Sequence, residues 1–274
     1  MNEFINTLKK RPLLTAALAL VVAVLAIKLP QPTYWNKCVL RIMLCGAMLF
    51  FLYLISGEKT ISKSDKRIGY TFKHLLSFLL FALILGSMSV VAKLMDGEVE
   101  SGVLLRLVTI LVMTLFVGIF EELCFRAIMN DAIVYRFRDS KGVFAVSAVV
   151  SALVFGAVHM VGSPLSSALD WAQAAMKTLS CAVMGIAFLI LYWKTRNVFA
   201  IGLVHGLYDF FGAGSLILGG PARIGAGNYV LQGEEGVKGL VTLGIQLIVG
   251  IVLTLLVWKK VGKTIDFKAM RENW

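Results

Sequence analysis

The polarity of this chain is arranged in long blocks, in which roughly twenty apolar residues in a row are followed by short polar segments. An α-helix of about 20 apolar residues can cross the roughly 30 Å of hydrocarbon in a bilayer. The apolar runs are continuous and do not alternate with a period of two, which favours helices over membrane strands. The pattern therefore predicts eight helical spans, at 13–29, 38–55, 74–95, 103–121, 143–161, 172–193, 198–218 and 239–258.

Composition supports a membrane protein rather than a soluble one. The 274 residues are 58% hydrophobic and 16% charged, and the mean hydropathy is +0.83. Soluble domains contain about 45–50% apolar and about 25% charged residues. In lipid, backbone polar groups must be bonded internally, which leaves helices or a closed barrel. We therefore expect an all-α, polytopic transmembrane helical bundle in which residues 1–274 form a single integral membrane domain.

The formal net charge of +11 is explained by membrane topology. Most lysines and arginines lie in the segments that face the cytoplasm if the N-terminus is inside, and a smaller group, including Lys37 and Arg41, falls to outer segments. The positive-inside rule then predicts eight spans with both termini cytoplasmic, in a multi-pass protein of the cell membrane. The partners expected from this charge are membrane lipids. Basic patches interleaved with aromatic residues are absent, so we expect no nucleic acid; the oligomeric state stays open.

Ionisable residues inside the predicted spans are few. Each is a functional candidate, because burying one in a span costs at least about 2.5–3.5 kcal/mol. His74 lies at a predicted cytoplasmic edge, and we expect no catalytic role for it. The candidates form three groups with helical spacing: Glu121, Glu122 and Arg126; Phe155 and His159; and His205 and Asp209.

Helical spacing separates the two adjacent glutamates. Residues four apart share a helix face, so Arg126 can hold Glu122. Glu121 lies about 100° around the helix and is left without a partner on its own helix. A carboxylate that is removed from water beside a second one holds a proton more tightly, as a general base near neutral pH requires.

A helical hairpin would set Glu121 and His159 at the same level, because each is nineteen residues from Ser140. The helix that carries Glu121 would then extend beyond the membrane. Residues 160–170 would have to rise through the protein as irregular backbone. Such backbone is allowed at membrane depth only where it is buried or lines a wet cavity.

Two glycines lie close to His205 in the third group. Gly202 and Gly206 form a small-xxx-small pattern, which predicts the close approach of another helix. His205 and Asp209 could satisfy each other in a purely structural role, since they are one helical turn apart. Two further polar groups in the same membrane also need partners, which favours a shared site.

The three groups occur in a fixed order, as E-E-x-x-x-R at 121–126, F-x-x-x-H at 155–159 and H-x-x-x-D at 205–209. In this order on successive hydrophobic helices they resemble the CPBP family of intramembrane proteases (CAAX protease and bacteriocin-processing, or Abi). That family includes the Rce1-type CAAX prenyl endopeptidases. The resemblance covers residues 104–211, the motif-bearing core of the chain.

The resemblance implies a catalytic role for four residues. Glu121 would be the catalytic glutamate and, with His159, would activate water for attack on a peptide carbonyl. His205 and Asp209 would stabilise the oxyanion. The family often has asparagine where this chain has Asp209, so Asp209 would act as a protonated donor or through His205.

The remaining motif residues would have supporting roles in the family arrangement. Glu122 and Arg126 would provide orientation and charge balance. Phe155 would form a wall of the cavity.

Zinc is an alternative means of activating the water. His159, His205 and either Glu121 or Glu122 could bind Zn²⁺ with a water molecule at an open position. The family has been described both as metalloproteases and as metal-independent glutamate proteases. The chain contains no H-E-x-x-H motif, so the sequence leaves the cofactor open between none and zinc.

The sequence therefore predicts an intramembrane endopeptidase of the CPBP type, either a glutamate protease or a metallo-endopeptidase. Its substrate would be a lipidated CAAX-type protein, a peptide precursor or a membrane-associated segment. The alternative is a non-proteolytic polytopic membrane protein, such as a scaffold, an immunity or regulatory protein, or a proton-coupled carrier. The polar motifs have no counterpart in the first three predicted spans, which weighs against the inverted repeats of a carrier.

Overall fold

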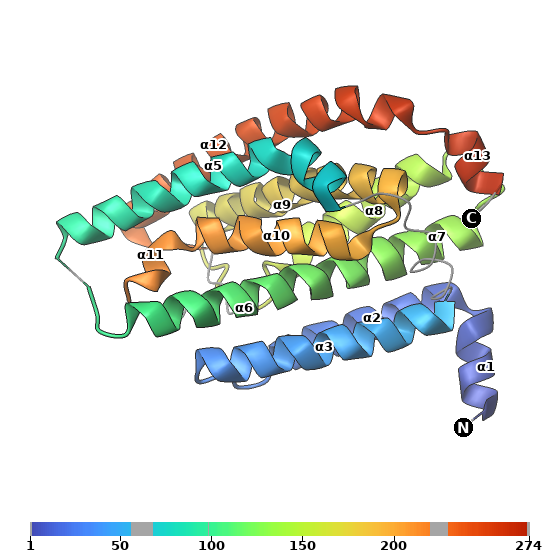
Figure 1. The fold of residues 1–274 in the computed structure, drawn as a ribbon, viewed down its shortest axis with the longest axis horizontal. Coiled ribbons are helices and arrows are strands. Elements are labelled where there is room, and N and C mark those ends of the chain that lie inside the picture. Colours follow the sequence, from blue (N-terminus) through green and yellow to red (C-terminus); the bar gives the residue numbers. More distant parts are fainter. Residues whose placement is uncertain (1, 56–67, 98, 220–229, 273–274) are drawn as a thin grey trace. The chain divides into compact units, whose positions relative to one another are not determined.

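The computed structural model describes residues 2–55, 68–97, 99–219 and 230–272 (Figure 1). Throughout these residues the regular elements are helices, so the all-α prediction is confirmed. The predicted cytoplasmic loop around Lys63 and residues 220–229 of the glycine-rich segment 219–238 lie outside the described residues.

Five helices within the described residues are long and apolar enough to cross a membrane. The predicted spans at 13–29, 143–161 and 198–218 correspond to shorter helices, which are α2 (Pro12–Ile27), α8 (Val143–Val158) and α10 (Val198–Gly212). If α2 and α1 (Asn2–Lys10), which meet at a bend of 106°, are counted together as one span, the number of candidate spans among the described residues rises to six. The count of eight spans and the cytoplasmic termini remain predictions. The five helices are Tyr34–Ile55, Ile68–Met95, Val103–Arg136, Ala168–Thr195 and Glu235–Thr264.

The first of two compact units comprises residues 1–128 and 195–225. In its described part, α10 packs against both α5 (Ile68–Met95) and α6 (Val103–Glu122). The helix α3 (Tyr34–Ile55) packs on α6, and α2 packs on α3 (Figure 1). The short helix α11 (Gly214–Ile217) follows α10 and contacts α5.

Glycines bring α6 and α10 into close contact. A Cβ atom added at Gly202 would lie 2.7 Å from Cα of Ile119, and one added at Gly206 would lie 2.5 Å from Cα of Leu115. Gly118 on α6 faces the backbone of the two α10 glycines in turn. The close helix approach predicted from the small-xxx-small pattern is therefore confirmed, and α6 is the partner helix.

The helix that begins with α6 changes its winding where the first motif lies. After α6 ends at Glu122, the chain forms a π-helical segment, Leu123–Asn130, and then α7 (Asp131–Arg136). Single π-helical turns inside α-helices are frequent at functional sites. The whole helix from Val103 to Arg136 has 34 residues, more than the roughly 20 that a span needs.

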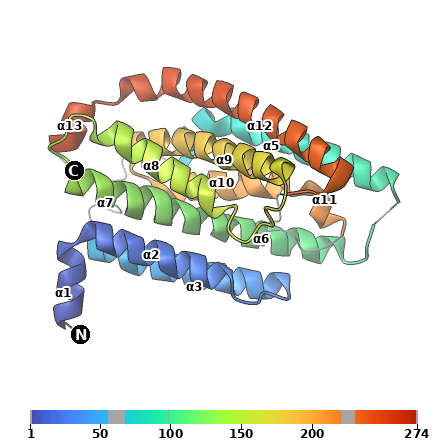
Figure 2. The same cartoon turned by 180° about the vertical axis from the view of Figure 1, so that it is seen from behind.

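The second compact unit comprises residues 129–194 and 226–274. It contains α7, α8, α9 (Ala168–Thr195), α12 (Gly233–Lys260), the 3₁₀ turn Gly262–Thr264 and α13 (Phe267–Glu272), as Figure 2 shows from behind. The hydroxyl of Thr254 on α12 donates to the carbonyl of Val183 on α9 at 3.1 Å. Gly156 of α8 lies against the carbonyl of Thr178 on α9.

Between α8 and α9 the chain has no helical structure over residues 159–167. The irregular backbone expected over 160–170 is therefore shorter than predicted, because α9 already begins at Ala168. The start of α9 is fixed by a reciprocal cap. The hydroxyl of Ser167 accepts from the backbone N–H of Asp170 at 3.2 Å, and the Asp170 carboxylate accepts from the backbone N–H of Ser167 at 2.9 Å. The hydroxyl and backbone N–H of Ser166 also donate to Asp170. These bonds satisfy N–H groups that a helix start leaves without partners.

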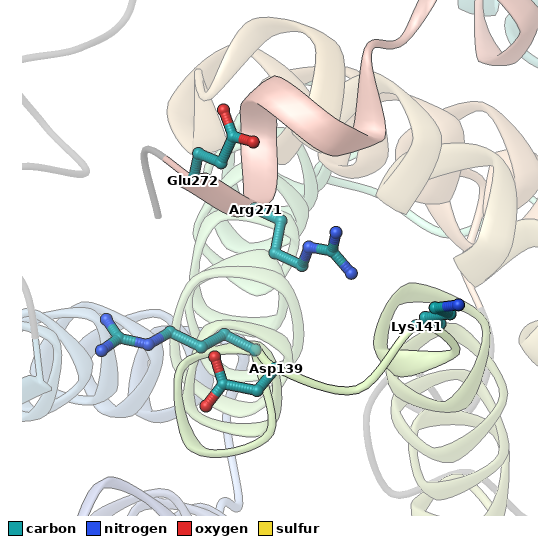
Figure 3. A pocket seen from close by; sticks show the side chains of 5 residues that line it. Asp139, Lys141, Arg271 and Glu272 are labelled. Carbon is teal, nitrogen blue, oxygen red and sulfur yellow. The ribbon is translucent and has the colours of Figure 1, made fainter.

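A polar pocket lies near the end of α7 and the beginning of the α7–α8 turn (Figure 3). Its lining carries charges of both signs on long side chains, and it includes no residue of the three motifs. We therefore do not identify it with the candidate active site. The lining residues are Arg138, Asp139, Lys141, Arg271 and Glu272.

Candidate active site

Glu122 joins α6 to α10. It is fully buried at the end of α6, and its Oε2 lies 3.0 Å from Nε of Arg126 in the π-helical segment. Its Oε1 lies 2.8 Å from Nδ1 of His205 on α10. An ionised carboxylate can only accept hydrogen bonds, so Nδ1 of His205 carries the hydrogen and donates it. Glu122 thus fixes the orientation of the His205 ring while Arg126 balances its charge.

Glu121 and Asp209 lie at the opposite edge of the same ring. Nε2 of His205 is 3.7 Å from Oε2 of Glu121 and 3.7 Å from Oδ2 of Asp209. Both distances are longer than a hydrogen bond. The side chain of Glu121 is 15% exposed and that of Asp209 is 32% exposed, whereas Glu122 is buried. The two carboxylates accessible to water therefore flank one imidazole nitrogen.

This cluster concentrates negative charge in a largely buried place. Burying charges without partners costs several kcal/mol per ion, so the three carboxylates need nearby cations. Arg126 supplies one, and Arg41 of α3 interacts electrostatically with Glu121. A protonated His205 has an N–H at both ring nitrogens and is attracted by the carboxylates around it. Chemically, such a ring can present an N–H to an anion that forms beside Glu121.

Phe155 and His159 belong to the second unit and lie at the end of α8. His159 is the residue that follows the last turn of this helix, and its Nδ1 lies 2.7 Å from the carbonyl oxygen of Phe155. The rings of the two residues meet edge to face, with centroids 4.8 Å apart. A carbonyl only accepts, so Nδ1 of His159 carries the hydrogen, and in the neutral ring Nε2 keeps a lone pair.

The structure thus brings five of the seven predicted site residues together within the first unit. The Glu122–Arg126 contact expected from spacing is present, and so is the approach of Asp209 to His205. The other two residues, Phe155 and His159, touch each other in the second unit. No sequence pattern indicated that Glu122 would bond to His205, because that contact depends on how closely α6 and α10 pack.

A metal ion finds no ready set of ligands among the described residues. They contain no group of three or more histidine, cysteine, aspartate or glutamate side chains arranged to hold one. In addition, Nδ1 of His205 is already bonded to Glu122. We therefore derive the chemistry of this site without a metal-dependent step.

Two buried cationic residues of α3 were not recognised from the sequence. Lys37 and Arg41 were assigned to an outer segment, but both are residues of α3 and each is only 3% exposed. The sequence feature that could have indicated their burial is their spacing of four residues at the start of an apolar block. The two residues were interpreted as part of the polar segment before the span, because the boundary between a helix and the segment that precedes it is hard to place from hydropathy alone.

Comparison with known families supports the motif-based interpretation. Residues 103–211 match the family model described as type II CAAX prenyl endopeptidase Rce1-like, and this stretch contains all three motifs. Neither the curated proteins nor the solved structures gave a significant match. Residues 103–211 are therefore similar to the Rce1-like family of CAAX prenyl endopeptidases, and the resemblance predicted from the motifs is confirmed.

Proposed function

We propose that this protein is an intramembrane endopeptidase that hydrolyses a peptide bond in a lipidated CAAX-type protein, a peptide precursor or another membrane-associated substrate. Glu121 acts as the base and His159 assists it, while His205 and Asp209 stabilise the oxyanion. Glu122 and Arg126 orient the site, and Phe155 supports His159.

One observation carries this proposal. Glu122 is buried, forms an ion pair with Arg126 and accepts a hydrogen bond from His205, whereas Glu121 keeps some exposure and lies beside the other nitrogen of His205. Two adjacent glutamates thus have different environments. One is suited to holding a ring in place, and the other is suited to exchanging a proton with water. Pairs of carboxylates with separated environments are characteristic of acid–base catalysis.

In the proposed reaction, Glu121 takes a proton from a water molecule, and Nε2 of His159 accepts a hydrogen bond from the same water. The water oxygen attacks the peptide carbonyl carbon. The resulting oxyanion accepts a hydrogen bond from Nε2–H of His205. The C–N bond then breaks as Glu121 returns the proton to the leaving nitrogen, which gives a free carboxylate and a free amine.

The test is cleavage of a labelled, farnesylated C-a-a-X peptide by the purified protein in detergent. We expect cleavage by the wild type and none by Glu121→Gln, which removes the base and keeps the shape of the side chain. Asp139→Asn, which alters a surface carboxylate of the polar pocket, is the control and should cleave like the wild type. Full activity of Glu121→Gln would refute the mechanism.

Elemental analysis of the same active preparation addresses zinc. We expect turnover to persist in protein that contains no stoichiometric metal and after treatment with a chelator. A stoichiometric zinc ion whose removal abolishes cleavage would transfer His159 and His205 to ligand roles.

The alternative function, a non-proteolytic scaffold, regulator or carrier, would use the same polar residues without hydrolysis. Its signature would be a stable protein with no cleavage of lipidated, precursor or transmembrane peptides. The difference in burial between Glu121 and Glu122 favours the protease, because a structural ion pair alone has no need for a second, partly exposed carboxylate beside the ring.

A further inference from the structure

Five ionisable side chains line the polar pocket of the second unit. The turn between α7 and α8 supplies Arg138, Asp139 and Lys141, and α13 supplies Arg271 and Glu272. The cavity between them has a volume of about 540 Å³. Among the described residues, no contact within ion-pair distance joins one of its three cations to one of its two carboxylates. The lining therefore has a net positive charge that its own members do not neutralise at close range.

An aromatic contact fixes the position of α13 beside the turn. Phe267, the first residue of α13, packs against three rings at centroid distances of 5.1–6.3 Å. Residues four apart share a helix face, so Arg271 lies one turn beyond Phe267 on the same face. Figure 3 shows Arg271 extending from α13 towards the turn, on the same side as Lys141, whereas the Glu272 side chain points away. The three rings are those of Phe144 in α8, Trp193 in α9 and Trp258 in α12.

The pocket lies at the basic end of the second unit, where α9 and α12 end. Beside the pocket, the described residues there include several lysines and one further exposed carboxylate, Asp266. The opposite end of the same helices carries Asp170 and the paired Glu235 and Lys238. Basic and aromatic residues gathered at one end are typical of the cytoplasmic side of a membrane protein, where the membrane exposes anionic lipids. The lysines are Lys194, Lys259, Lys260, Lys263 and Lys268.

Apolar side chains are exposed on the two helices that lead away from this end. Val146 and Val149 of α8 and Leu255 of α12 are each more than half exposed. Val146 follows Lys141 of the pocket by only five residues, and Leu255 precedes Trp258 by three. A ligand with a charged head in the pocket and an apolar tail along these helices would contact both kinds of surface, as a phospholipid does and a soluble ion does not.

We propose that this pocket binds the phosphate headgroup of an anionic phospholipid. Arg271 donates to two phosphate oxygens, since a guanidinium matches a phosphate in a bidentate manner, and Lys141 adds a second cation. The acyl chains lie along the exposed apolar residues of α8 and α12. This site acts on the attachment of the second unit to lipid, and it does not depend on the proposed hydrolysis at Glu121.

General attraction between a basic surface and an anionic membrane is the competing explanation. In that case every cation at this end would contribute equally, whether or not it lines the pocket. The experiment measures binding of a fluorescent, short-chain phosphatidylglycerol to the full chain in neutral detergent. Phosphatidylcholine with the same acyl chains is the reference lipid, because its ammonium group cancels the charge of its phosphate.

We expect Arg271→Gln to weaken phosphatidylglycerol binding about tenfold to hundredfold, the range for hydrogen bonds to charged groups. Lys260→Gln is the matched control, a cation at the same end but outside the pocket, and should lose no more than about fivefold. Asp139→Asn removes a carboxylate from the lining and should strengthen binding by about fivefold. A gain of this kind cannot come from a variant that fails to fold. Wild-type protein should bind phosphatidylcholine at least about tenfold more weakly than phosphatidylglycerol.

Three results would overturn the proposal. Equal losses in Arg271→Gln and Lys260→Gln would assign lipid binding to the basic surface as a whole. Equal affinity for the two lipids would show that the pocket does not recognise the negative charge of the headgroup. Inorganic phosphate that binds as tightly as phosphatidylglycerol, and loses its affinity in Arg271→Gln, would make the ligand a soluble phosphate instead of a lipid. The measurement requires no cleavage, so failure of the proposed protease function would leave its outcome unaffected.

Discussion

The two histidines of the candidate site are held by different kinds of acceptor. Nδ1 of His205 donates to the buried carboxylate of Glu122, which comes from a neighbouring helix. Nδ1 of His159 lies 2.7 Å from a carbonyl of its own helix, that of Phe155. The first contact therefore depends on the packing of α6 against α10, whereas the contact between His159 and Phe155 lies within the end of α8.

This difference has chemical consequences. A ring bonded to a carboxylate and surrounded by further carboxylates can carry the positive charge of an imidazolium and donate from Nε2. A neutral carbonyl supports a positive charge on the ring less than a carboxylate does, and a neutral ring offers its Nε2 lone pair as an acceptor. In the proposed mechanism, these local contacts suit His205 to donate to the oxyanion and a neutral His159 to accept from the attacking water.

The third histidine is an informative comparison for His159. His74 of α5 has Nδ1 at 2.9 Å from the carbonyl oxygen of Tyr70, and the centroids of the two rings are 4.2 Å apart. The local contact is the same as that between His159 and Phe155, although no role was predicted for His74. The contact to residue i−4 is therefore a common way to hold a histidine on a helix and does not by itself identify a site.

Replacing the two histidines by glutamine should separate their roles, and His159→Gln should show the largest effect. It removes a basic nitrogen, so we expect kcat to fall by about 10²–10⁴. His205→Gln keeps an N–H donor, as glutamine can serve in oxyanion sites, and should lose less. His74→Gln is the matched control and should leave turnover unchanged. Equal losses in His159→Gln and His205→Gln would contradict the division of roles.

Glu122→Gln should damage the fold rather than the chemistry alone. Arg126 and His205 both lose their charged partner in a buried place, and breaking a buried pair costs about 3–5 kcal/mol. We expect a lower thermal unfolding temperature in detergent together with reduced activity. Glu235→Gln removes the exposed contact between Glu235 and Lys238, 2.7 Å long, and should cost less than about 1 kcal/mol.

Unchanged stability of Glu122→Gln with a complete loss of turnover would instead make Glu122 a reacting group. The assignment of Glu121 and Glu122 to different functions would then be wrong. For that reason Glu121→Gln and Glu122→Gln should be measured side by side, each for unfolding temperature and for turnover.

Gly206→Ala tests whether the α6–α10 contact positions His205. The added methyl group would meet the backbone of Leu115, which cannot move aside as a flexible side chain can. Overpacking of this kind costs about 1–3 kcal/mol. We expect lower stability and lower turnover together. Gly46→Ala in α3, where nothing lies within 4 Å of the added Cβ, should be neutral or stabilising by up to about 1 kcal/mol.

The sequence predicted those structural features that depend on a local pattern of residues. The apolar blocks predicted the helices, and the spacing of four residues predicted the pair of Glu122 and Arg126. The small-xxx-small glycines predicted a close contact between two helices. The π-helical winding after Glu122 was not predicted, because no single residue signals it. The bond between Glu122 and His205 was also missed, since its two residues are 83 positions apart and meet only after α6 and α10 pack.

Arg41 shows the limit of hydropathy most clearly. A cation at the start of an apolar block looks the same in sequence whether it faces water or the protein interior. Only packing against α6 distinguishes the two, and the structure buries it.

Asp209→Asn should have the smallest effect of the changes within the site. Asp209 lies 3.7 Å from Nε2 of His205 and is the most exposed of the three carboxylates. If it acts by holding His205 or as a neutral donor, an amide of the same shape with one acceptor oxygen and two donor hydrogens should serve nearly as well. We expect Asp209→Asn to retain turnover within about tenfold.

Asp209→Ala, which has neither donor nor acceptor, should lose about 10²–10³ in kcat. Turnover of both variants is measured with the same farnesylated peptide used for Glu121→Gln. If Asp209→Asn were as inactive as Glu121→Gln, the negative charge itself would be required, and Asp209 would have to share the role of base that is assigned here to Glu121.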